Sequence, residues 1–157
     1  MTQKAKIARE YLLGYRRAIE NEKIIKNRIK YIEDKKQEQR EKYLNSNFPK
    51  RDKILGGKQK DLSDVVEKIM DIYDKEIISM VEELEKAYSV ARSIFTTVSI
   101  CNLESVEKDY IALRFFEGKS NSDIRKTIGY SERGMYNIRK KALQKVGDKI
   151  EENKIVS

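Results

Sequence analysis

The stretch "SNSDIRKTIGYSERGMYNIRKKALQKV", residues 120–146, contains two helix starts and one helix end close together. Ser120 and Asp123 have the spacing of a capping box, with Asp in place of the more usual Glu or Gln. Gly129 is typical of a helix C-terminus, and Ser131 is a candidate N-cap for the helix that follows. The stretch therefore predicts two helices joined by a short turn that contains glycine, the pattern of a helix-turn-helix motif.

A further short helix is expected immediately before this motif. In "LESVEKDYIALRFFEG", Val106, Tyr110, Leu113 and Phe116 fall on one face, and Gly118 is placed to end the helix. We therefore predict a helix-turn-helix domain over residues 101–157.

The last helix of the motif has an apolar and a polar face when it is drawn at about 100° per residue. The predicted core face is Met135, Ile138, Ala142 and Val146. The opposite side and its flanks carry Arg133, Tyr136, Asn137, Lys140, Lys141, Gln144 and Lys145. Arg139 lies near the core face, where its stem is expected to pack and its charge to be paired or to reach solvent.

The polar face has the residue types that read duplex DNA. Arg and Lys bind guanine edges or phosphates, Asn and Gln pair with adenine, and Tyr packs on sugar or a thymine methyl. Residues 120–145 contain 7 Lys/Arg and 2 Asp/Glu, a net charge of +5 that suits a phosphate-binding surface. A solvated basic face is the alternative. Gly134, in the first turn, is either tolerated drift or a gap that lets DNA approach the backbone.

Two long helices are predicted before this domain, at about residues 3–44 and 61–97. The first has an apolar stripe of Ala8, Tyr11, Leu12, Tyr15, Ile19, Ile25, Ile29 and Ile32. The second has a stripe of Leu62, Val65, Ile69, Ile72, Tyr73, Ile77, Met80, Val81, Leu84, Tyr88, Ala91 and Phe95. Pro49 and the pair Gly56-Gly57 indicate a linker over residues 45–60. Residues 1–100 are therefore predicted to form a long antiparallel helical hairpin.

Charge distinguishes these two helices. Residues 4–42 contain 13 Lys/Arg and 7 Asp/Glu, a net charge of +6, whereas residues 61–86 contain 9 Asp/Glu and 3 Lys, a net charge of −6. The basic helix is therefore expected to face the acidic one. Pairing between subunits, giving a homodimer through the N-terminal helices, is left open.

Composition limits the classes of function. The net charge of +8 and the pI of about 9.4 favour a polyanionic partner, most often nucleic acid. The chain has no histidine and one cysteine, and the "GGK" at Gly57 lacks the earlier Gly and the following Ser or Thr of a P-loop. We therefore expect no enzyme activity, metal site or cofactor. No apolar run suggests a signal peptide or a membrane span, so a cytoplasmic protein is expected.

The C-terminal sequence resembles region 4 of sigma-70-type transcription factors. The likeness is carried by "LRFFEGKS", by "DI" and "IGYS" of the first motif helix, and by the ending "KALQKV", and it extends over residues 103–146. The whole layout also resembles small phage and prophage proteins of Gram-positive bacteria, through "REYLLGYRRAIENEKIIKNRIKYIE" and "LSDVVEKIMDIYDKEI". Some of those proteins, of the ArpU and RinA type, activate late phage genes.

The resemblance implies that the first motif helix crosses the DNA backbone and that the second enters the major groove. It implies base-facing roles for Glu132, Arg133, Tyr136 and Asn137. Two positions depart from the family pattern: Arg125 stands where Ala is usual, and Gly134 where a polar or basic residue is frequent.

The leading hypothesis is a sequence-specific, DNA-binding transcription regulator of phage or prophage type, acting on double-stranded DNA in the bacterial cytoplasm. The residues expected to contact bases or sugars are Glu132, Arg133, Tyr136, Asn137 and Lys140. Those expected to contact phosphates are Ser120, Arg125, Lys126, Ser131, Lys141, Gln144 and Lys145. Two alternatives are a DNA-packaging protein similar to a small terminase subunit and an interaction protein that binds RNA polymerase.

Overall fold

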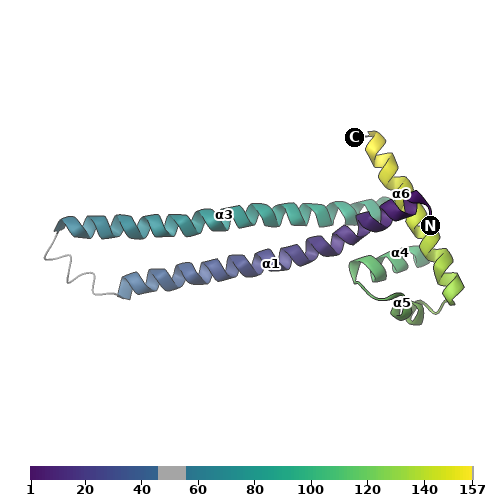
Figure 1. Cartoon of the computed structure of the whole chain (residues 1–157), viewed down its shortest axis with the longest axis horizontal. Helices are drawn as coiled ribbons and strands as arrows, with labels where there is room; N and C mark the ends of the chain where they lie inside the picture. Colours follow the sequence, from purple (N-terminus) through teal and green to yellow (C-terminus); the bar gives the residue numbers. More distant parts are fainter. Residues whose placement is uncertain (46–55, 157) are drawn as a thin grey trace. The chain divides into compact units, whose positions relative to one another are not determined.

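The computed structural model describes residues 1–45 and 56–156, and these residues are helical apart from short connections (Figure 1). The elements in chain order are α1 (Gln3–Asn45), α3 (Gly56–Ile100), α4 (Ser105–Ile111), the π-helical segment η1 (Ala112–Phe116), α5 (Asn121–Ile128) and α6 (Glu132–Val156). The predicted all-α fold, a long helical hairpin followed by short helices, is confirmed. No helix in the described parts of the chain is long and apolar enough to cross a membrane.

The helices α1 and α3 form an antiparallel hairpin (Figure 1), and they are in contact. The Tyr11 hydroxyl lies 2.9 Å from the Thr97 hydroxyl, and Lys36 forms an ion pair with Asp74. The second helix is longer than the expected 61–97, because Gly56 to Lys60 already belong to α3. Residues 46–55 of the expected linker, with Pro49, lie outside the described residues.

The chain divides into two compact units, and neither unit has the bounds of the predicted hairpin, residues 1–100. Unit 1 comprises Met1–Asn21 and Ala87–Ser157, and unit 2 comprises Glu22–Lys86. The boundary expected between residues 100 and 101 therefore falls inside unit 1. The helices α1 and α3 each contribute residues to both units.

Unit 1 contains one continuous hydrophobic core. Its largest fully buried side chains include Leu12 from α1, Tyr110 and Ile111 from α4, Ile124 from α5 and Leu143 from α6. The first turns of α1 thus help to complete the core beneath the two motif helices. Burying one such aliphatic or aromatic side chain stabilises the fold by about 1.5–3 kcal/mol, so α1 is a structural part of the C-terminal domain.

Close contact between α1 and α6 depends on small residues. Ala5 and Ala8 are buried, and a Cβ atom at Gly147 would lie only 2.7 Å from the backbone oxygen of Lys4. Only glycine permits such a close approach of two helix backbones. The contact is reinforced at its edge by Lys4, whose Nζ lies 3.0 Å from Asp148 and 2.9 Å from Glu151.

The helix predicted before the motif is two segments. The α-helix α4 continues directly into the π-turn of η1, in which the Glu117 backbone N–H donates to the Ala112 carbonyl oxygen at 2.9 Å. Phe116, the last residue of η1, packs against Tyr15 of α1, with ring centroids 4.4 Å apart. Gly118, with φ of 73°, then ends the segment as the sequence predicts.

Candidate nucleic-acid interface

The helices α5 and α6 are joined by the three-residue turn 129–131, and each predicted end signal is in place. The Ser120 hydroxyl accepts a hydrogen bond from the Asp123 backbone N–H at 3.2 Å. Gly129 has the left-handed conformation, with φ of 81°. The Ser131 hydroxyl accepts from the Gly134 backbone N–H at 3.1 Å. These caps fix the two helix ends and therefore the turn that sets the direction of α6.

The predicted core face of α6 is confirmed. Met135, Ile138, Ala142 and Val146 are all buried, and they pack in the same core as Ile124 of α5. This burial fixes the rotation of α6 about its own axis. The polar residues of its first half must therefore point away from the core.

The exposed side of the first half of α6 contains all five side chains expected to contact bases or sugars, together with Lys141. The exposed residues of this face are Glu132, Arg133, Tyr136, Asn137, Lys140 and Lys141. Within the described residues, none of the cations Arg133, Lys140 and Lys141 takes part in an ion pair. Unpaired cations at the open end of a helix-turn-helix can bind phosphates or base edges without first breaking an internal contact.

The expected phosphate-contacting residues before α6 lie in different environments. Lys126 of α5 is exposed, whereas Arg125 is half-buried and its Nε is buried without a hydrogen-bond partner. The Ser120 and Ser131 hydroxyl oxygens accept backbone hydrogen bonds as caps, although both residues are exposed. Lys126 is consequently the freer of the two α5 cations for an external anion.

Two residues expected to contact phosphates have partners within the protein. Lys145 Nζ lies 2.7 Å from Glu107 Oε1, and the Gln144 side-chain oxygen accepts a hydrogen bond from the Thr2 hydroxyl at 2.7 Å. The hydrogen bond with Glu107 raises the pKa of Lys145, so its charge is held firmly at neutral pH. Both residues follow Lys141 by about one turn, and they contact Thr2, which precedes α1, and Glu107 of α4. Arg139 is half-buried beside the core face.

Glu107 is a buried acidic residue that the sequence pattern did not single out. It has a relative exposure of 1%, and its Oε2 has no hydrogen-bond partner. Its sequence position did carry a signal, since Glu107 is four residues from both Leu103 and Ile111, which are buried. The buried carboxylate attracts Lys145 and so connects α4 to α6.

Gly134 is contacted by its own turn. A Cβ atom there would lie 3.2 Å from Cδ1 of Tyr130 and 3.3 Å from the Ser131 hydroxyl oxygen. The Tyr130 ring therefore lies against the first turn of α6. This gives a third explanation for the glycine, beside drift and close approach of DNA: it leaves room for the tyrosine that precedes the cap.

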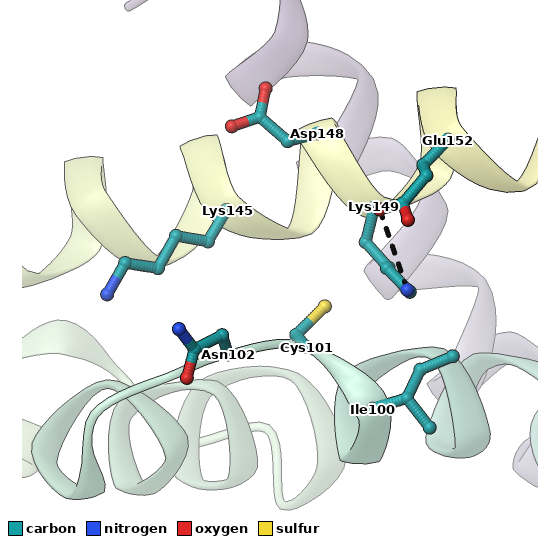
Figure 2. A pocket seen from close by; sticks show the side chains of 7 residues that line it. All are labelled: Ile100, Cys101, Asn102, Lys145, Asp148, Lys149 and Glu152. Carbon is teal, nitrogen blue, oxygen red and sulfur yellow. Dashed lines mark ion pairs between the residues drawn. The ribbon is translucent and has the colours of Figure 1, made fainter.

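A small cleft lies on the side of α6 that faces the end of α3, and Figure 2 shows its lining. Its volume is about 300 Å³, and its lining residues are Ile100, Cys101, Asn102, Lys145, Asp148, Lys149 and Glu152. Lys149 pairs with Glu152 at 3.5 Å, so the cations and carboxylates of the cleft largely balance. Burial raises the pKa of the Cys101 thiol, which keeps it protonated and weakly nucleophilic. Over residues 1–45 and 56–156, no group of three acidic or cysteine side chains is arranged to hold a metal ion.

The structure defines an all-α chain, with a long hairpin followed by short helices and a C-terminal helix. Comparison with protein-family models, with curated proteins and with solved structures found no match.

Proposed function

We propose that the protein is a sequence-specific, double-stranded DNA-binding transcription regulator of the phage and prophage type. The observation that carries the proposal is the first half of α6. There, Arg133, Tyr136, Asn137 and Lys140 are exposed, opposite a face that is buried in the core. This is the arrangement by which a recognition helix presents side chains to the major groove.

The proposed roles follow from the position of each side chain. Arg133 and Asn137, one turn apart, can reach successive base edges, Arg toward guanine and Asn toward adenine. Tyr136 packs on sugar or a thymine methyl, and Lys140 continues the same face. Lys126 and Lys141 contact the flanking phosphates. Gln144 and Lys145 are left out of this set because both have partners in the protein.

The test begins with selection of bound duplexes from a random pool, followed by titration of the selected site and of a scrambled duplex. Arg133→Ala is expected to weaken binding to the selected site by about 1–3 kcal/mol. The matched control is Arg92→Ala, which removes the same charge from an exposed position on α3. Equal affinity for selected and scrambled duplexes would contradict a sequence-specific regulator.

Salt dependence separates the two classes of contact. Lys126→Ala and Lys141→Ala should each weaken binding to all sequences and reduce the slope of log K against log salt by about 1. Asn137→Ala should relax the preference at one base pair and leave that slope almost unchanged. A Lys141 variant that changes the preferred sequence would argue against a phosphate contact at that position.

A further inference from the structure

Unit 2 buries much less apolar surface than unit 1. Among its described residues, Ile25 is the only hydrophobic side chain that is buried, at 8% exposure. The large hydrophobic side chains that remain exposed in unit 2 are Ile24, Tyr31, Leu44, Val65, Ile72, Ile78 and Val81. Each helix of a two-helix pair can bury only one stripe of the other. A pair that has further apolar residues therefore normally buries them against additional helices.

Four of the exposed residues share one side of the hairpin. Each directly precedes a buried or half-buried residue of the α1–α3 contact; the pairs are Ile24 with Ile25, Tyr31 with Ile32, Val65 with Val66, and Ile72 with Tyr73. A step of one residue turns the side chain by about 100° from the contact. Two antiparallel helices are related by a local twofold axis perpendicular to the plane that contains both helix axes. The residue before a contact residue therefore lies on the same side of the hairpin in α1 and in α3.

The register of the hairpin makes these four residues one continuous stripe. The ion pair between Lys36 and Asp74 places Ile72 at the level of Glu38, and Val65 seven residues further along. Ile24, Tyr31, Ile72 and Val65 therefore follow one another at intervals of about 10 Å, over a length of about 30 Å. The stripe passes from α1 to α3 halfway along.

We infer that this stripe is the seam on which unit 2 of a second copy of the chain docks, giving a homodimer with a four-helix bundle. A twofold axis that relates two identical stripes makes the interface self-complementary. Ile78, by contrast, follows Ile77 of the contact and points about 120° away from Ile72, so it lies outside the seam.

Charge selects the arrangement of the two hairpins. In residues 22–44 there are 8 Lys/Arg and 5 Asp/Glu, a net charge of +3, and in residues 63–86 there are 8 Asp/Glu and 3 Lys, a net charge of −5. A twofold axis along the hairpin places α1 against the α3 of the partner, with opposite charges facing. An axis across the hairpin would instead pair α1 with α1 and α3 with α3, which like charges disfavour.

This arrangement has a consequence for the rest of the chain. Both hairpins then point the same way, so Glu22 and Lys86 of both copies lie at the same end of the bundle. The inference does not depend on DNA binding, and it is tested without DNA.

The test is the mass of the full-length protein, measured by light scattering and sedimentation over a wide concentration range. The wild type should be a dimer, and Ile72→Lys should shift the monomer–dimer equilibrium at least tenfold toward monomer. Ile78→Lys is the matched control, because Ile78 is 59% exposed and Ile72 is 63% exposed on the same helix. A monomeric wild type at every concentration, or equal dissociation in both variants, would overturn the inference. Circular dichroism establishes that each variant keeps its helical content.

Cross-linking tests the orientation. The register places Tyr31 level with Ser79, so the axis along the hairpin brings Tyr31 close to Ser79 of the partner subunit. Tyr31→Cys and Ser79→Cys proteins, made separately and then mixed, should give the mixed dimer with a short bis-maleimide. The wild type, with buried Cys101 alone, should give none. Absence of the mixed product from a protein that is dimeric by mass would overturn the proposed arrangement.

Discussion

Replacing Gly147 by alanine tests whether the first turn of α1 really lies on α6. The new Cβ would stand 2.7 Å from the Lys4 carbonyl oxygen and 3.0 Å from the Lys4 carbonyl carbon. Both atoms belong to the backbone of a helix, so neither can move aside by a side-chain rotation. Either α1 shifts away from α6 or the variant keeps a strained contact.

The expected change combines two opposing effects. Alanine in place of glycine in a helix interior contributes up to about 1 kcal/mol, whereas overpacking costs about 1–3 kcal/mol. Gly147→Ala should therefore lower the free energy of unfolding by about 1 kcal/mol, which corresponds to a fall in Tm of about 2–4 °C for a chain of this size. Gly134→Ala in the same helix gains from the same propensity and meets only side-chain atoms, of Tyr130 and Ser131. It should be neutral or stabilising.

Urea titration followed by circular dichroism measures both variants against the wild type. The pair compares a glycine whose new Cβ would meet only side-chain atoms, Gly134, with one whose new Cβ would meet the Lys4 backbone, Gly147. If Gly147→Ala is as stable as Gly134→Ala, or more stable than the wild type, the reasoning on the α1–α6 approach is wrong.

Two further predictions can be tested by the same urea titration. Ser120→Ala should lower stability by about 1 kcal/mol, because it removes the cap on the Asp123 N–H, while Ser122→Ala, also exposed in the first turn of α5, should change it little; equal effects would contradict a capping role for Ser120. The second outcome concerns Lys4 and Lys145, whose pKa values are raised from the ordinary 10.5 mainly by hydrogen bonds to Glu151 and Glu107. Since a raised pKa stabilises the fold below the unfolded value, this contribution should be lost as the pH rises through the folded pKa values, and a double variant Lys4→Met, Lys145→Met should lose less stability over that alkaline range than the wild type. A variant with the same alkaline loss as the wild type would show that other groups cause it.

The helix ends in the C-terminal half could be predicted because their signals are local. Ser120, Gly129 and Ser131 each act on backbone groups within three or four residues, and all three have the predicted conformation or hydrogen bond. The buried face of α6 could also be predicted, because Met135, Ile138, Ala142 and Val146 recur at helical spacing. The prediction of a linker at Gly56 and Gly57 was wrong, because both glycines belong to α3.

The division into units could not be predicted from local pattern. Ala5 and Ala8 look like neutral helix formers, and nothing near them in the sequence reveals that they join a core with residues of α4, α5 and α6. The partners of Lys145 and Gln144 are equally distant, at Glu107 and Thr2. A helical wheel shows which side of a helix is polar, but it does not show which polar residues another helix already engages. For the same reason Arg133 and Lys140 could not be distinguished from Lys145 by sequence alone.

The interleaved order of the units bears on how the chain folds during synthesis. Residues 1–21 are synthesised before residues 87–150, which supply the other side chains of the core that contains Ala5 and Leu12. Unit 2 is continuous in sequence and can pair its two helices before that. Its closure brings Asn21 and Ala87 together, and so removes most of the loop-closure entropy that joining the two halves of unit 1 would otherwise cost. Nascent chains that stop short of α6 should therefore contain a formed hairpin and an unfolded unit 1. Unit 1 can fold only after α6 has been synthesised.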